Sequence, residues 1–419
     1  MNYHKQHLSG YIERISGSSI ASIAGIFVIP LIGWLLGPEA VAIYNLVLYY
    51  AGVFAFFYIF KFDVIFADTS RNYLNSFFVF TSIYFLLVSI FLCVVIFILF
   101  KLGELSAKDF ILYISATLSA AFLSISTNAQ NRIHTERLFL ISGLSDLYSK
   151  IIVAIGVLMG YLYDISHIAF YASLPIIMYL FKSSYLIYKS NDSISSINFS
   201  KYKKIKKSCK TFFSDHLVVK NTFFLNLSSG ILAFTGIAQL ETVLKFSSMA
   251  DLGVYLMSTV IIYGPISIVS KSVGDVFIQH YQAGKGVFGS IVKDYYLIIA
   301  LSFFVGFCLI VLFWTLPDEM DLLYFGKEWG SLIEITRVLV LTTPVMIASS
   351  AFERIPIITG AVYFAPFYNL LRLLIFTVFY FISNDMILHD VVYFFSAVNI
   401  IFYFCVIIYC KRFIKRAGF

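Results

Sequence analysis

The sequence predicts an all-helical protein that crosses a membrane many times. Of its 419 residues, 60% are hydrophobic and only 13% carry a charged side chain, whereas about 25% of the residues in a soluble domain are charged. So few charges cannot cover the surface of a water-soluble globule. The apolar residues also gather into runs of about 20, the length that a helix needs to cross the hydrocarbon core of a bilayer.

Twelve apolar runs are long enough to span the membrane, six on each side of a long basic stretch. We therefore expect an N-terminal six-helix lobe over residues 1–188, a cytoplasmic linker over 189–220 that contains the sequence KYKKIKKSCK, and a C-terminal six-helix lobe over 221–419. The runs cover residues 16–36, 41–61, 76–100, 110–130, 140–162, 168–188, 221–244, 252–272, 294–315, 331–352, 362–383 and 390–410.

The distribution of basic residues predicts that both termini face the cytoplasm. Lys and Arg are enriched in the cytoplasmic flanks of membrane spans. With this orientation, 23 of the 30 basic residues lie in inner segments and only four lie in outer segments. The net charge of +7 thus follows from membrane topology and does not call for a nucleic-acid partner. The five cysteines contain no Cys-x-x-Cys pair, so we expect neither a metal site nor a structural disulfide.

The two predicted halves share a weak internal similarity. GPEAVAIY (37–44) follows the first run, and SMADLGVY (248–255) follows the seventh. Asp63-Val-Ile-Phe similarly parallels Asp275-Val-Phe at almost the same offset along the chain. These matches indicate a duplicated six-helix unit whose two copies have the same orientation in the membrane. Chance similarity between short apolar stretches is the alternative.

These segments resemble the Wzx-type O-antigen and polysaccharide flippases of the MOP (multidrug/oligosaccharidyl-lipid/polysaccharide) superfamily. The stretches that carry the resemblance are Gly37-Pro38-Glu39 with Tyr44, Phe62-Asp63-Val64-Ile65, Leu252-Gly253-Val254-Tyr255, Ser272-Val273-Gly274-Asp275-Val276-Phe277-Ile278-Gln279 and Phe325-Gly326-Lys327-Glu328-Trp329.

This resemblance implies two six-helix lobes in a V shape around a central cavity, in the inner membrane of a bacterium. It implies that undecaprenyl-pyrophosphate-linked oligosaccharide is moved from the cytoplasmic to the periplasmic leaflet. It also makes the polysaccharide polymerase machinery a candidate partner.

Ionisable residues inside the predicted spans are the candidates for substrate binding. Each costs about 2.5–3.5 kcal/mol at the centre of the bilayer on insertion scales, so it faces a cavity or a partner. Asp146 and Lys150 are four residues apart and form either an intrahelical ion pair or a cavity pair. Arg372 has no acidic residue within a turn, and its guanidinium matches the geometry of phosphate. Arg337 is a further candidate, although pairing with Glu334 three residues earlier is the structural alternative.

Four acidic residues are candidates for coupling or gating. Glu241 lies one turn before Lys245 and either pairs with it or binds a proton or cation that couples transport to an ion gradient. Asp63 and Asp275 lie near the cytoplasmic ends of the second and eighth runs, where they form a gate or simply polar helix ends. Glu334 lies near the outer mouth.

The sequence contains no motif for catalysis or ATP hydrolysis. It lacks the phosphate-binding loop G-x-x-x-x-G-K-[ST], His-Glu-x-x-His and Gly-x-Ser-x-Gly. We therefore expect a transporter without a cofactor, driven by substrate binding, product removal or a gradient of protons or sodium ions. One alternative is a drug/cation antiporter of the same superfamily. Another is a membrane O-antigen polymerase or glycosyltransferase, which should carry a long outer loop, whereas the long loop here is cytoplasmic.

Overall fold

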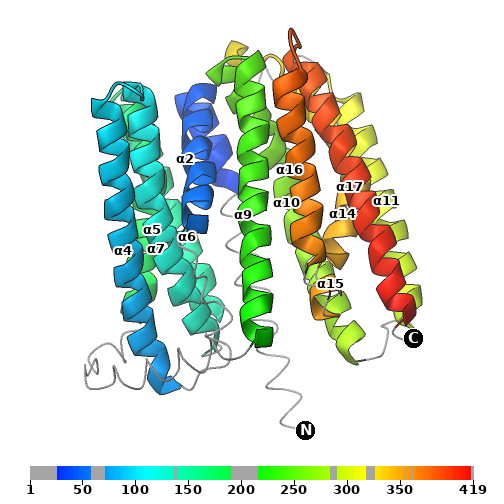
Figure 1. Cartoon of the computed structure of the whole chain (residues 1–419). Coiled ribbons are helices and arrows are strands. Elements are labelled where there is room, and N and C mark those ends of the chain that lie inside the picture. Colours follow the sequence, from blue (N-terminus) through cyan, green and yellow to red (C-terminus); the bar gives the residue numbers. More distant parts are fainter. Residues whose placement is uncertain are drawn as a thin grey trace. The chain divides into compact units, whose positions relative to one another are not determined.

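The computed structural model is helical throughout the part of the chain that it describes (Figure 1). That part comprises residues 26–57, 71–135, 139–189, 216–283, 290–317, 326–353, 355–359, 361 and 363–416. Its helices include α2 (Pro38–Phe57), α4 (Arg71–Lys101), α5 (Ala107–Thr135), α6 (Phe139–Leu162), α7 (Ile168–Lys189), α9 (His216–Phe246), α10 (Met249–Ala283), α11 (Ile291–Thr315), the 3₁₀ helix η3 (Lys327–Trp329), α13 (Leu332–Val340), α14 (Thr343–Phe352), α15 (Ile355–Ile358), α16 (Phe364–Ile382) and α17 (Leu388–Arg416). The predicted all-α class is confirmed.

The helices match the predicted spans along the chain. Within the described residues, ten helices are long and apolar enough to cross a membrane, and one bent helix pair makes an eleventh. A shorter apolar helix, Ile26–Leu36, covers the described part of the first predicted run, 16–36. The other eleven runs each coincide with a helix or with the bent pair. The chain is thus a multi-pass membrane protein.

The bent pair divides the predicted span 331–352. The segments Lys327–Val340 and Thr343–Phe352 meet at an angle of 55°. Pro344 lies in the first turn of α14, where its missing N–H costs no helical hydrogen bond. The neighbouring helix α11 makes room with Gly306, because a Cβ added there would lie 2.5 Å from the Cα of Pro344. A proline and a small residue on its neighbour together account for the bend.

The chain forms two compact units. Unit 1 contains the N-terminal residues up to Leu31 and Ile43–Phe234, and unit 2 contains Ile32–Ala42 and Thr235–Phe419. The division falls inside α9, and α2 likewise contributes residues to both units. Unit 2 therefore contains a short segment from the start of the chain.

In unit 1, α5 packs between α4 and α7 (Figure 1). Its buried positions carry small residues such as Ala116, Ala120 and Ser119, which allow transmembrane helices to approach closely. Polar side chains join neighbouring helices as well. Asn128 of α5 donates a hydrogen bond to the hydroxyl of Thr81 on α4 at 3.2 Å. Unit 1 is therefore held together by close packing and by hydrogen bonds shielded from water.

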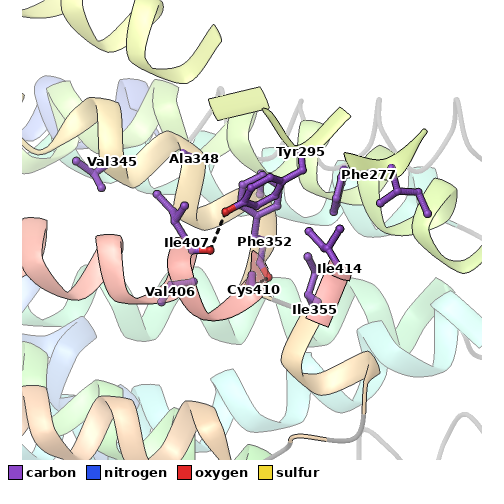
Figure 2. Packing of buried hydrophobic residues seen from close by; sticks show 12 residues of the cluster. Phe277, Tyr295, Val345, Ala348, Phe352, Ile355, Val406, Ile407, Cys410 and Ile414 are labelled. Carbon is purple, nitrogen blue, oxygen red and sulfur yellow. Dashed lines mark hydrogen bonds between the residues drawn. The ribbon is translucent and has the colours of Figure 1, made fainter. Parts of the chain in front are cut away.

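Unit 2 has a core of aromatic and branched side chains from α10, α11, α14, α15 and α17 (Figure 2). Tyr295 of α11 stacks obliquely on Phe352 of α14, with ring centroids 4.7 Å apart. Its hydroxyl donates a hydrogen bond of 2.8 Å to the carbonyl of Ile407 on α17. The buried thiol of Cys410 reaches the carbonyl of Phe352 at 3.4 Å. These contacts tie α17 to the bent α14.

The two similar sequence segments meet inside unit 2. A Cβ added at Gly253 of α10 would lie only 1.9 Å from the carbonyl oxygen of Pro38, so the backbones of GPEAVAIY and SMADLGVY are in direct contact. Nearby, a Cβ at Gly33 would lie 2.6 Å from Met257. Glycine is needed at position 253 because any side chain would push the two backbones apart.

Gly253→Ala should destabilise the protein measurably. The added methyl group meets a backbone carbonyl that cannot rotate away, and overpacking of this kind costs about 1–3 kcal/mol. We expect a lower midpoint of thermal unfolding for the purified protein in detergent. Gly52→Ala is the matched control, because its Cβ would have its nearest neighbour at an ordinary 3.7 Å. Equal midpoints for both variants would show that the contact does not contribute.

Candidate functional site

Unit 1 contains an ion pair between two adjacent spans. The Asp146 carboxylate on α6 lies 2.6 Å from the Lys182 ammonium on α7, and the two side chains are only 18% and 12% exposed. Asp146 is five residues from the start of the span Ile141–Leu162, which is about 8 Å along the helix axis. The pair thus lies inside the membrane-spanning part of both helices.

Lys150 adds a second positive charge to this pair. It lies one turn after Asp146 on α6 and interacts electrostatically with both Asp146 and Lys182. The cluster thus contains two lysines and one carboxylate. Asp146 joins two helices instead of pairing only along its own helix, and the cluster has a formal charge of +1.

Two tyrosines connect the cluster to α2. Tyr179 of α7 lies one turn before Lys182 and interacts electrostatically with Asp146. Tyr44, which belongs to the GPEAVAIY segment, contacts the residue before Tyr179. The Tyr44 hydroxyl donates to the sulfur of Met178 at 3.4 Å. We call Asp146, Lys150, Tyr179 and Lys182 the α6–α7 cluster.

Unit 2 contains a different arrangement around Arg372 on α16. The residue is partly exposed, and its guanidinium carbon lies 5.7 Å from the centroid of the Phe376 ring. Its Nε is buried and has no hydrogen-bond partner within the described part of the chain. Arg372 is eight residues from the start of α16, about 12 Å along the helix axis. The predicted lone cation is therefore near the middle of its helix.

A buried amide lies at the same level on α17. Two ring contacts fix how α16 and α17 align: Tyr368 with Phe402 at 5.1 Å and Phe376 with Phe395 at 5.2 Å. Arg372 is one turn from Tyr368 and from Phe376. Asn399, which is 7% exposed, lies between Phe395 and Phe402, and its Oδ1 has no partner among the described residues.

The other charged candidates lie near helix ends. Arg337 donates hydrogen bonds to the carbonyls of Phe313 at 3.1 Å and Leu316 at 2.5 Å, so it stabilises the C-terminal end of α11. Glu334 is exposed and lies 3.4 Å from the imidazole of His389.

Lys245 likewise supports the end of α16. It donates to the carbonyls of Tyr380 at 2.6 Å and Ser383 at 2.9 Å. Glu241, one turn earlier on α9, is partly buried and has an interaction of its own.

The side chains of two predicted residues lie outside the described part of the chain. Asp63 lies outside the described residues, and Asp275 is part of α10 while its side chain lies outside the described part. No group of three or more His, Cys, Asp or Glu side chains that could hold a metal ion occurs among the residues described.

Sequence reasoning missed Lys182 and Asn399. Lys182 lies within the predicted span 168–188, toward the end that is predicted to be cytoplasmic, where a basic residue is common. Asn399 is uncharged and does not stand out in an apolar run. A search for every polar residue inside a predicted span would have included both.

Comparison with solved structures assigns the fold. An inward-facing multidrug resistance MATE family transporter of the MOP superfamily matches over 95% of both chains, with a TM-score of 0.64 and 12% identity. An outward-facing MATE family transporter of the MOP superfamily matches over 97% of this chain and 95% of its own, with a TM-score of 0.59 and 14% identity. The chain has the fold of the MOP superfamily transporters.

A third similar structure is a MOP superfamily transporter from Pyrococcus furiosus. It covers 98% of this chain and 96% of its own, with a TM-score of 0.60 and 13% identity. Reverse polarity of its binding pocket suggests a different function for that protein. No protein-family model matches this sequence, and no curated protein is similar to it in sequence. The predicted MOP fold is confirmed over nearly the full length.

Removing Asp146 should destabilise unit 1 more than removing it together with Lys182. Asp146→Ala leaves two partly buried lysines without their carboxylate, and breaking a buried pair costs about 3–5 kcal/mol. Asp146→Ala/Lys182→Ala removes the pair together and should recover part of the loss. A double-mutant cycle of thermal unfolding midpoints measures the coupling. Lys189→Ala, at the exposed end of α7, is the control. Strictly additive effects would contradict the ion pair.

Proposed function

We propose that this protein is a flippase for lipid-linked oligosaccharide. In this proposal it moves undecaprenyl-pyrophosphate-linked O-antigen repeat units from the cytoplasmic to the periplasmic leaflet by alternating access. The sugars and the pyrophosphate pass through a hydrophilic path while the polyprenyl tail remains in lipid. Such a path is needed because moving a polar head group through hydrocarbon unaided costs too much free energy.

The positive charge at two places inside the membrane-spanning helices is the observation that carries this proposal. In the α6–α7 cluster, two lysines lie near one carboxylate. In unit 2, Arg372 has a buried Nε that makes no hydrogen bond to any described residue. Cations at these depths favour an anionic substrate, because their attraction is little screened in a medium of low dielectric. Pyrophosphate is such an anion.

The fold supports transport as the class of function. Solved structures with this fold include inward-facing and outward-facing transporters, which are the two states that alternating access requires. We therefore propose transport without an enzymatic step. Glu241, Asp63, Asp275 and Glu334 stay candidates for coupling to a proton or sodium gradient or for gating. Of these, Glu241 is the one whose partly buried side chain lies within a described span.

An antiporter for cationic drugs is the second candidate function. It is favoured by the similarity to multidrug resistance transporters. Asp146 would then be the binding group for a cation, but Lys182 already occupies it at 2.6 Å. Export of ethidium from cells by the wild-type protein, and its loss in Asp146→Asn, would favour this candidate. Absence of export by the wild-type protein would favour the flippase.

The proposal places the protein in the bacterial inner membrane with both termini in the cytoplasm, beside the polysaccharide polymerase machinery. A green fluorescent protein fused after Phe419 should therefore fluoresce, because it folds in the cytoplasm. Alkaline phosphatase at the same position should be inactive. The opposite pattern would reverse the topology and with it the direction of transport.

Arg372→Ala should abolish surface polysaccharide in a host whose polysaccharide depends on this protein, with protein levels unchanged. The loss of a mid-membrane cation removes the attraction for the anionic head group. Arg372→Lys, which keeps the charge but not the planar guanidinium, should retain part of the activity. Lys189→Ala, which removes an exposed positive charge at the end of α7, is the control and should leave surface polysaccharide unchanged. Normal polysaccharide in Arg372→Ala would refute the role of this residue.

A further inference from the structure

We propose that Arg372 and Asn399 together bind a hydroxyl-bearing sugar of the transported glycan. This inference rests on the proposed function and assigns a part of the substrate to one place in unit 2. It starts from two buried polar atoms on the adjacent helices α16 and α17. Each of them lacks a partner among the described residues, and one is a donor while the other is an acceptor.

The contacts between α16 and α17 bring the two side chains to one level. Phe364 stacks on Tyr409 with centroids 3.8 Å apart, and at the other end Phe379 stacks on Phe394 at 3.7 Å. The helices are therefore antiparallel and in contact along this length. Arg372 is on the same face of α16 as Tyr368 and Phe376, which contact α17. Asn399 is on the corresponding face of α17.

Both orphan atoms need a partner, because each buried polar group that is left unsatisfied costs about 1–3 kcal/mol. The Nε of Arg372 can only donate a hydrogen bond, and the Oδ1 of Asn399 can only accept one. A fully ionised phosphate oxygen would satisfy Arg372 but would leave Asn399 without a donor. A hydroxyl group accepts from one partner and donates to another, so sugar hydroxyls match both atoms.

Burial and access agree with a binding role. Asn399 is 7% exposed, which makes its amide a fixed feature of the helix interface. Arg372 is partly exposed, so a ligand can reach the accessible part of its side chain, and a change of its rotamer would bring the buried Nε to the ligand. The ring of Phe376 lies 5.7 Å from the guanidinium carbon and restricts its orientation. The glycan would thus contact α16 and α17 through its hydroxyls, while the charge of Arg372 still attracts the pyrophosphate.

The test measures binding of two separate probes to the full-length protein in lipid nanodiscs. One probe is the free oligosaccharide released by hydrolysis from the lipid-linked repeat unit of the host, and the other is inorganic pyrophosphate. In Asn399→Leu, which removes the acceptor, the dissociation constant for the oligosaccharide should rise at least tenfold. The constant for pyrophosphate should change less than twofold. Ser302→Ala, which removes a buried hydroxyl of α11 that bonds within its own helix, should change neither.

A second variant should weaken the binding of pyrophosphate and not that of the oligosaccharide. Asn399→Asp keeps an acceptor but adds a negative charge beside Arg372, so oligosaccharide binding should be retained and pyrophosphate binding should weaken. Unchanged oligosaccharide binding in Asn399→Leu would mean that water alone satisfies the two atoms, and the inference would be wrong. If Asn399→Leu weakened the binding of pyrophosphate and left that of the oligosaccharide unchanged, the inference would also be wrong.

The inference and the proposed function fail in different ways. If the wild-type protein flips fluorescently labelled lipid-linked oligosaccharide in proteoliposomes while Asn399→Leu binds the free glycan normally, only the inference is refuted. If the wild-type protein neither flips that lipid nor binds the free glycan, the proposed function is refuted as well.

Discussion

Every charged side chain inside the hydrocarbon must be paired, solvated or bound to a ligand, and this constraint organises the polar structure of the protein. An unpaired charge at that depth costs several kcal/mol. Asp146 and Lys182 meet the constraint by pairing across two spans. Arg337 and Lys245 meet it near helix ends, where each donates to carbonyls that have no partner within their own helix. These basic side chains thus stabilise the fold and complete helix termini at the same time.

One group meets the constraint only in part, and it carries the functional argument. Arg372 keeps a buried Nε whose hydrogen is accepted by no described residue. A protein that only had to be stable would gain from replacing such groups with apolar ones. Polar groups that cost stability are retained where they interact with something outside the protein. In the proposed function, that partner is a phosphorylated glycan.

The packing shows how the chain combines rigid and broken helices. Small residues allow backbones to touch, as where Gly253 meets Pro38. Gly306 makes room for Pro344 at the 55° bend of the eleventh span. Residues Ile32–Ala42 belong to unit 2, so the contact between the two similar sequence segments is also a contact between the start of the chain and its second half. This contact gives a physical reason for Gly253 in one of the segments that carry the family resemblance.

The sequence by itself determined the fold class and the positions of the spans, because a membrane requires about 20 apolar residues per helix and these runs are visible without any contact information. It also placed Arg372 and Lys150 inside spans, since a charge in an apolar run is conspicuous. Only the tertiary structure decided the partners. Asp146 pairs with Lys182, 36 positions along the chain, and Asn399 aligns with Arg372 on an adjacent antiparallel helix. Such pairings depend on how the helices rotate and pack, which the period of an apolar run does not specify.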